Sequence, residues 1–88
     1  MDNRRRIQLS ERFKSSEKGA SLWAALVGAE RAHLEANREA VIAGKAFRAF
    51  AVEIEAVEEA LEKAGKAAQV EKAAREAWEA AKVAFISS

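Results

Sequence analysis

The sequence predicts an all-α protein, a small three-helix bundle, and three observations lead to this prediction. The 88 residues include no Pro, which disrupts helices most strongly, and 22 Ala, which favours them most. From residue 20 onward, apolar side chains recur every three or four positions, as they do on one face of a helix. The apolar–polar alternation typical of strands is absent. A chain of this length is expected to form one small domain.

The first 19 residues are polar and irregular. We expect 1–19 to be a basic, partly disordered arm, followed by a single helical domain at 20–88. Within the arm, Leu9 and Phe13 are four residues apart, and Ser10 is suited to cap a short helical turn. The rest of the arm is expected to become ordered only where it docks on the domain.

Basic residues are concentrated in this arm, since residues 1–18 carry six Lys or Arg and three acidic residues. The consecutive Arg4, Arg5 and Arg6 are candidate phosphate contacts, because flexible basic arms are common in nucleic-acid-binding proteins. Glu11 and Glu17 dilute the positive charge, and no later helix is basic. A solubilising terminus is therefore the favoured interpretation, and nucleic-acid binding is the alternative.

The tetrapeptide Ala-Gly-Lys-Ala occurs twice, at 43–46 and at 64–67. At the second copy, Gly can adopt the left-handed conformation that ends helices, and the apolar pattern restarts beyond it. At the first copy this argument is weaker, because an interior Gly costs only about 1 kcal/mol relative to Ala. The favoured boundaries of the three helices are 20–43, 45–64 and 67–86.

An alternative architecture is a hairpin in which residues 20–63 form one long helix. A continuous heptad pattern supports it and runs through Leu22, Leu26, Ala29, His33, Ala36, Ala40, Ala43, Phe47, Phe50, Ile54, Val57 and Leu61. The last helix would then cover only half of the long one, and the apolar face of residues 22–41 would need a second chain. Such a hairpin is expected to dimerise into a helical bundle.

The predicted core joins an apolar stripe to an alanine-rich last helix. Phe47, Phe50, Ile54 and Leu61 are expected to be buried against residues 70–85. The inner surface of the last helix is expected to comprise Ala67, Val70, Ala73, Ala74, Ala77, Ala81 and Ala84, with Trp78 and Phe85 at its edge. Contacts between small side chains bury little area, so we expect a modestly stable monomer that self-associates.

Three polar residues interrupt the apolar face of the first predicted helix. Glu30-x-x-His33 has the spacing found in di-iron carboxylate bundles, but the chain has one His and no second copy of the motif, so no metal or cofactor is expected. With Asn37, these residues are interpreted as a hydrogen-bonded ladder between helices, a solvated edge or a contact with another protein. The candidate partner or dimer face comprises Trp23, Val27, Glu30, His33, Leu34, Asn37 and Val41.

The strongest charge feature is the stretch 53–62, which contains five Glu and no basic residue. Four of them span about 100° of helix surface and form a candidate acidic docking strip for a basic partner, which comprises Glu55, Glu58, Glu59 and Glu62. Like charges four residues apart are slightly unfavourable, and a solvated helix face is the ordinary explanation of such a run.

The function predicted from these features is not enzymatic. The chain has no Cys, no Gly-rich phosphate loop and a single His with no evident acidic partner beyond Glu30. We expect a helical protein–protein interaction module, an adaptor, assembly factor or inhibitor that self-associates and occupies another protein's surface. The alternative is a nucleic-acid-binding accessory protein that uses the basic arm. The lack of Cys fits the cytoplasm, and no run of 18 apolar residues is present to cross a membrane.

Overall fold

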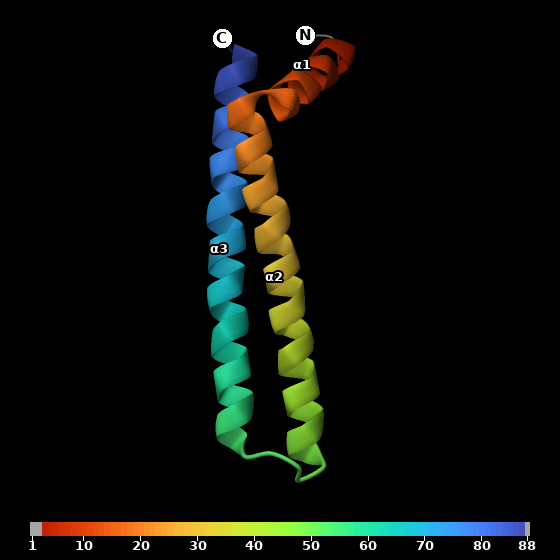
Figure 1. Ribbon diagram of the computed structural model, residues 1–88, viewed down its shortest axis with the longest axis vertical. Coiled ribbons are helices and arrows are strands. Elements are labelled where there is room, and N and C mark those ends of the chain that lie inside the picture. The colour runs from red at the N-terminus through yellow and green to blue at the C-terminus, as the bar shows by residue number, and fades with distance from the viewer. Residues whose placement is uncertain (1–2, 88) are drawn as a thin grey trace.

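The computed structural model describes residues 3–87, in which three helices follow one another. They are α1 (Asn3–Ser15), α2 (Glu17–Arg48) and α3 (Ile54–Ser87). Helices α2 and α3 form a long antiparallel hairpin, and α1 lies across its open end beside the last turns of α3 (Figure 1). The prediction of a small all-α bundle with three helices is confirmed, although the bundle is extended, with dimensions of 57 × 19 × 18 Å.

The predicted helix boundaries are wrong. Gly44 lies inside α2 and Gly65 lies inside α3, so neither Ala-Gly-Lys-Ala segment ends a helix. The turn falls instead at 49–53, a position that neither the three-helix boundaries nor the single helix 20–63 anticipated. The physical reason is that an interior Gly is inexpensive, and no Ser, Thr, Asp or Asn follows either segment to cap a new helix.

The turn between α2 and α3 is a Schellman motif that contains no glycine. The N–H of Ala51 donates to the carbonyl of Ala46 at 2.8 Å, and the N–H of Phe50 donates to the carbonyl of Phe47 at 2.9 Å. Phe50 has a φ of 59°, in the left-handed region that Gly usually occupies. Because the segment around Phe50 contains no Gly, Pro, Asn or Asp, the sequence carries no recognisable turn signal.

The seam between α2 and α3 follows a heptad spacing and is lined mainly by small residues. On α2 the buried residues are Leu26, Ala29 and Ala36, and on α3 they are Ala64 and Trp78. Partly buried residues continue the same spacing, namely Leu22, His33, Ala40 and Ala43 on α2 and Val57, Ala60, Ala67, Glu71, Ala74 and Ala81 on α3. The heptad predicted for residues 22–43 therefore describes the α2 side of this seam.

The predicted core is wrong in its second half. Phe47, Phe50, Ile54 and Leu61 are exposed, and residues 70–85 lie too far along the hairpin to cover them. The cause is the turn position, since a turn at 49–53 pairs the end of α2 with the start of α3. The inner surface of α3 is also rotated from the predicted one, because Trp78 is buried whereas the following residues are exposed: Val70, Ala73, Ala77 and Ala84.

The main core lies at the open end of the hairpin, where all three helices meet. Phe13 of α1, Leu26 of α2 and Trp78 of α3 are buried together, with Leu22 and Trp23 packed against them. The centroids of the Trp23 and Trp78 rings are 5.0 Å apart. The N-terminal segment is thus helical from Asn3, whereas only a short turn around Leu9 and Phe13 was expected, and Phe13 is the residue that docks it.

The junction between α1 and α2 depends on Ser16 and Gly19. The Ser16 hydroxyl donates to the carbonyl of Phe13 at 2.6 Å and accepts from the N–H of Gly19 at 3.1 Å, so Ser16 is the N-cap of α2. A Cβ on Gly19 would lie 1.6 Å from the carbonyl oxygen of Phe13. The chain can therefore fold α1 back onto the hairpin only because residue 19 has no side chain.

Candidate interaction surfaces

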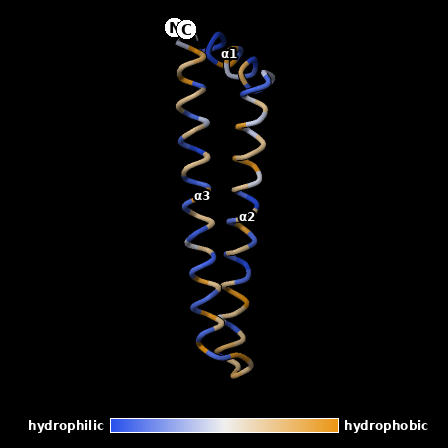
Figure 2. The backbone as a smooth tube through the Cα atoms, turned by 60° about the vertical axis from the view of Figure 1, so that its left-hand side comes forward, coloured by the Kyte–Doolittle hydropathy of each residue, from blue (hydrophilic) through white to orange (hydrophobic). Residues whose placement is uncertain are grey.

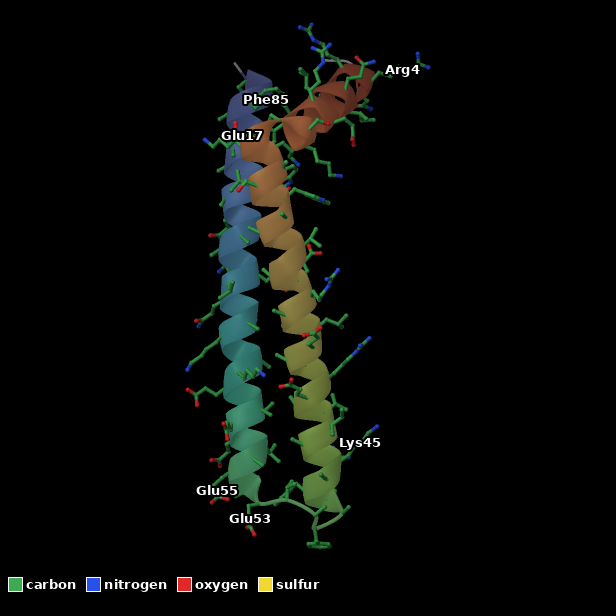
Figure 3. The ribbon with its side chains drawn as sticks, in the orientation of Figure 1. Arg4, Glu17, Lys45, Glu53, Glu55 and Phe85 are labelled. Carbon is green, nitrogen blue, oxygen red and sulfur yellow. The ribbon has the colours of Figure 1, made fainter. Side chains whose placement is uncertain are left out.

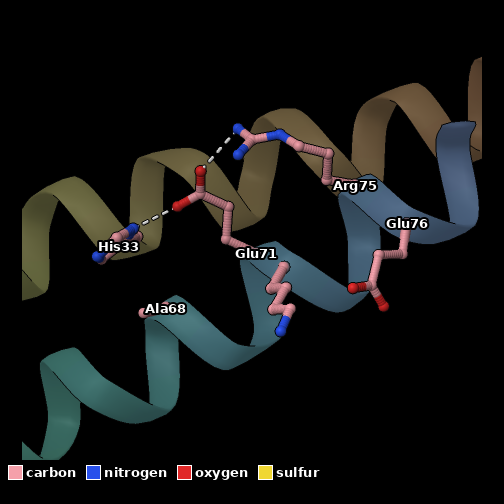
Figure 4. Close-up of a pocket in the computed structure, with 6 residues that line it drawn as sticks. His33, Ala68, Glu71, Arg75 and Glu76 are labelled. Carbon is pink, nitrogen blue, oxygen red and sulfur yellow. Dashed lines mark hydrogen bonds and ion pairs between the residues drawn. The ribbon is translucent and has the colours of Figure 1, made fainter.

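A polar cluster joins α2 and α3 near the middle of the hairpin (Figure 4). The Nδ1 of His33 is hydrogen-bonded to Oε2 of Glu71. Arg75 donates from Nη2 to Oε1 of Glu71 at 2.8 Å and to Oε1 of Glu30 at 3.1 Å. The hydrogen bond with His33, supported by Arg75, holds the pKa of Glu71 below its ordinary value. The hydrogen bonds that Arg75 donates to Glu30 and to Glu71 raise its own pKa.

Glu30 and His33 therefore face α3 within the same chain. His33 and Glu71 both occupy the heptad seam, where their side chains are partly buried and paired. Glu71 and Arg75 were not among the residues selected from the sequence, because their partners belong to another helix and the sequence alone does not give the register between the helices. His33 and Glu71 of this cluster thus occupy seam positions that hold apolar side chains elsewhere along the hairpin.

The structure divides the candidate partner face into two parts. Trp23 packs against Trp78, and the ammonium group of Lys14 lies 4.0 Å from the centroid of the Trp23 ring. On the outside of α2, by contrast, the apolar residues at seven-residue spacing are exposed, namely Val27, Leu34 and Val41. A shallow hollow on this outer surface is lined by Leu34, Asn37, Arg38, Val41 and Ile42.

The end of the hairpin nearest the turn lacks a core of its own. We call residues 37–63, which lie between buried Ala36 and buried Ala64, the turn-end segment, and none of its residues is buried. Its exposed large apolar side chains are Val41, Ile42, Phe47, Phe50, Val52, Ile54 and Leu61. Figure 2 shows hydrophobic stretches in the lower part of α2 and through the turn. The sequence identified most of these residues but assigned several of them to the core.

Three of the four glycines have no packing function within the chain. A Cβ added to Gly28, Gly44 or Gly65 would meet no other atom within 4 Å, in contrast to Gly19. Each of these glycines lies inside a helix, where Ala would be more favourable by about 1 kcal/mol. Their missing side chains are therefore not required by any contact within residues 3–87.

Most charged side chains of the turn-end segment are divided by sign between the two helices, with acidic Glu39 on α2 and basic Lys63 on α3 as exceptions. The acidic docking strip lies on α3, where Glu55, Glu58, Glu59 and Glu62 are all exposed. Lys66 pairs with Glu62 at 3.1 Å. On α2, the exposed Arg38 and Lys45 carry the opposite charge. In Figure 3, Lys45 projects from α2 away from α3, and Glu55 projects from α3 away from α2.

The candidate phosphate contacts lie on α1, at the opposite end of the molecule. Arg4, Arg5 and Arg6 are exposed in the first turns of this helix. Figure 3 shows Arg4 near the outer end of α1, far from the turn. The structure therefore separates the basic residues from the apolar turn-end segment by most of the length of the hairpin.

Two structural features bear on other classes of site. Within residues 3–87, no three His, Asp or Glu side chains are grouped so that they could hold a metal ion. None of the helices described here combines the length and apolar character needed to cross a membrane. The chain matches no protein-family model, no curated protein and no solved structure.

Proposed function

We propose that this chain is a non-enzymatic helical protein–protein interaction module, an adaptor, assembly factor or inhibitor that self-associates in the cytoplasm and occupies another protein's surface. The supporting observation is the turn-end segment, which exposes seven large apolar side chains and buries none. Large contiguous apolar patches are uncommon on monomeric proteins and mark interaction sites. The cytoplasm is proposed because the chain has no Cys.

The turn itself provides the most exposed apolar side chain. Phe50 is 95% exposed, and the Schellman hydrogen bonds donated by its own N–H and by that of Ala51 fix its backbone. Aromatic residues are enriched at the centres of interfaces, because they bury a large area and lose little conformational entropy. Phe47 and Val52 are exposed beside Phe50 and enlarge the apolar tip. We assign this tip to the contact with the other protein.

Site-directed photo-crosslinking in the native cell tests the proposal. A photoreactive residue replaces Val52, and a matched control carries it at Gln69, an exposed position on α3 outside the turn-end segment. We expect a discrete adduct with another protein from position 52 only. An excess of unlabelled wild-type chain should suppress this adduct, whereas unlabelled Phe50→Ser should not. Equal labelling from both positions would contradict the proposal.

A role in nucleic-acid binding gives a different result in a separate assay. Duplex DNA or RNA would be retarded by the wild-type chain, and retardation would fall steeply as salt is raised, because phosphate contacts release counterions. The effect would be lost in Arg5→Ala/Arg6→Ala and kept in Phe50→Ser. We expect no such retardation at physiological salt, and finding it would favour the basic segment of α1 as the functional surface.

A further inference from the structure

The chain exposes more surface than a compact protein of its mass. Its accessible surface is 6671 Å², whereas a compact 9.6 kDa monomer exposes about 5,100 Å². Its radius of gyration is 18.2 Å, compared with about 12 Å for a compact domain of this length. The surplus of about 1,600 Å² exceeds the ~800 Å² that each partner buries in a standard interface. A second chain could therefore be accommodated on surface that a compact fold would have covered.

One side of the hairpin is both bare and apolar. The ion pair between Arg75 and Glu30 marks this side of the seam. Residues separated by seven or fourteen positions lie on the same side of a helix in a heptad seam. Leu61 precedes Arg75 by fourteen positions and Gly44 follows Glu30 by fourteen, so both lie on the side marked by the ion pair. Leu61 is 57% exposed.

Neighbouring residues extend this surface along both helices. The ion pair of Lys63 with Glu39, at 2.9 Å, sets the register, so Val41 and Leu61, each two residues nearer the turn, lie level with one another. Ile54 precedes Leu61 by one heptad. Leu34 follows Glu30 by four positions and Gly65 follows Leu61 by four, so each lies next to that residue on the helix surface, and Val41 follows Leu34 by one heptad. The resulting surface, called the distal face, comprises Leu34, Val41, Gly44, Ile54, Leu61 and Gly65.

The two glycines of the distal face give it a shape suited to another helix. Open space surrounds the position of a Cβ on Gly44 and on Gly65. Gly lets a neighbouring backbone approach more closely than any other residue. An occupant packed closely on the distal face would thus explain two glycines that weaken their own helices. The exposed apolar residues beside them would be covered by the same occupant.

The charges that flank the distal face identify the occupant as another copy of the chain. The α2 edge carries Arg38 and Lys45, and the α3 edge carries Glu58 and Glu62. A two-fold axis parallel to the hairpin places α2 of each copy over α3 of the other, with both turns at the same end. The basic edge of each copy then meets the acidic edge of the other. An axis perpendicular to the hairpin would instead place α2 over α2, and the basic edges would meet.

We infer that a second copy of this chain packs on the distal face in the parallel two-fold arrangement and forms a four-helix bundle. The inference rests on the proposed function, because it identifies the surface by which the module self-associates. Both copies of Phe50 would remain at the end of the bundle, where the apolar tip can contact a different protein. Association would also give the turn-end segment the buried core that it lacks in one chain.

Size-exclusion chromatography with light scattering, applied to the full chain at low and high micromolar concentration, tests this inference. The wild-type chain should approach twice its mass of 9.6 kDa as its concentration rises. Leu61→Glu should remain a monomer, because it places a charge at the centre of the distal face. Gly44→Ala/Gly65→Ala should dimerise at least about tenfold more weakly, a free-energy difference of about 1.4 kcal/mol. Because Ala favours the helix, this weakening could not be attributed to misfolding.

Gly28→Ala is the matched control. Gly28 is as open as the other two glycines and lies on α2 outside the distal face, so this variant should dimerise like the wild type.

Arg38→Glu/Lys45→Glu and Glu58→Lys/Glu62→Lys should each dimerise poorly alone and form a heterodimer when mixed. A monomeric wild type, a dimer unaffected by Leu61→Glu, or failure of the charge-exchanged pair to associate would overturn the inference. Crosslinks from the tip to another protein would persist in monomeric Leu61→Glu, so they would report on the proposed function separately.

Discussion

Phe13 of α1 packs against Trp78 of α3 with their ring centroids 5.1 Å apart and their planes inclined by 37°. Both side chains are buried, at 3% and 5% exposed, and their contact joins the first helix to the last. The ring centroid of Phe85 lies 5.2 Å from that of Phe13, so Phe85 extends the cluster toward the end of α3. The buried aromatic core is therefore concentrated at the open end of the hairpin, whereas no residue of the turn-end segment is buried.

Trp78→Ala is expected to lower the free energy of unfolding by about 3–5 kcal/mol, because it leaves a cavity where the three helices meet. Urea denaturation at low protein concentration measures this change with little contribution from association. The same variant should release α1, so proteolysis near Ser16 should accelerate. A loss of less than about 1 kcal/mol would show that the aromatic cluster does not hold the helices together.

Gly19→Ala and Gly28→Ala should change stability in opposite directions. At residue 19 the new methyl group collides with the backbone of Phe13, so we expect a loss of about 1–3 kcal/mol. At residue 28 the methyl group meets open space, and the higher helix propensity of Ala should add about 0.5–1 kcal/mol. Thermal melts of the two variants provide the comparison. Similar melting temperatures would contradict the described junction between α1 and α2.

The sequence predicted the helical class and the α2 side of the seam. These succeeded because they follow from composition and from the local heptad spacing, which a helix preserves wherever it ends. Phe13 was likewise noted through its spacing from Leu9. The positions of the helix ends failed because Gly44 and Gly65 resemble helix stops, although each is only a mild penalty inside a helix.

The long-range features could not be predicted from the sequence. The turn uses Phe50 in a left-handed conformation, which no propensity argument assigns to an aromatic residue. Because the position of the turn was not predicted, the register between α2 and α3 was not predicted either. The hydrogen bond of His33 with Glu71 depends on that register. The division of the candidate partner or dimer face between the seam and the outer surface of α2 likewise depends on the register between the helices.

Phe50→Gly is expected to raise the free energy of unfolding by about 1 kcal/mol, because Gly adopts the left-handed conformation without the penalty of a Cβ. Phe50→Ala should change stability little, since it keeps a Cβ and removes only an exposed ring. Urea denaturation of both variants tests this. A loss of 3–5 kcal/mol in Phe50→Ala, as for a buried Phe, would mean that the aromatic ring packs within the chain.

Glu71 should make stability depend on pH below the ordinary pKa of a glutamate. Its pKa is lower in the folded chain, mainly because of the hydrogen bond with His33, so the unfolded chain takes up a proton first as pH falls. The contribution of Glu71 is therefore complete above a pH of about 4.5, the ordinary value, and is lost as pH falls through the lower pKa of the folded state. Glu71→Gln should show a shallower loss of stability over this range, measured by urea denaturation at successive pH values. An unchanged slope would contradict the described pairing.

The distance between the two turns in the associated protein tests the parallel two-fold arrangement most directly. The chain contains no Cys, so Ala51→Cys provides a unique site for a spin label at the turn, and pulsed electron paramagnetic resonance measures the separation between two copies. Packing of the distal faces with both turns at one end predicts a single distance of about 30 Å or less, given helix spacings of 8–10 Å. A distance near the 57 Å length of the molecule, or no dipolar coupling at high micromolar concentration, would contradict this arrangement.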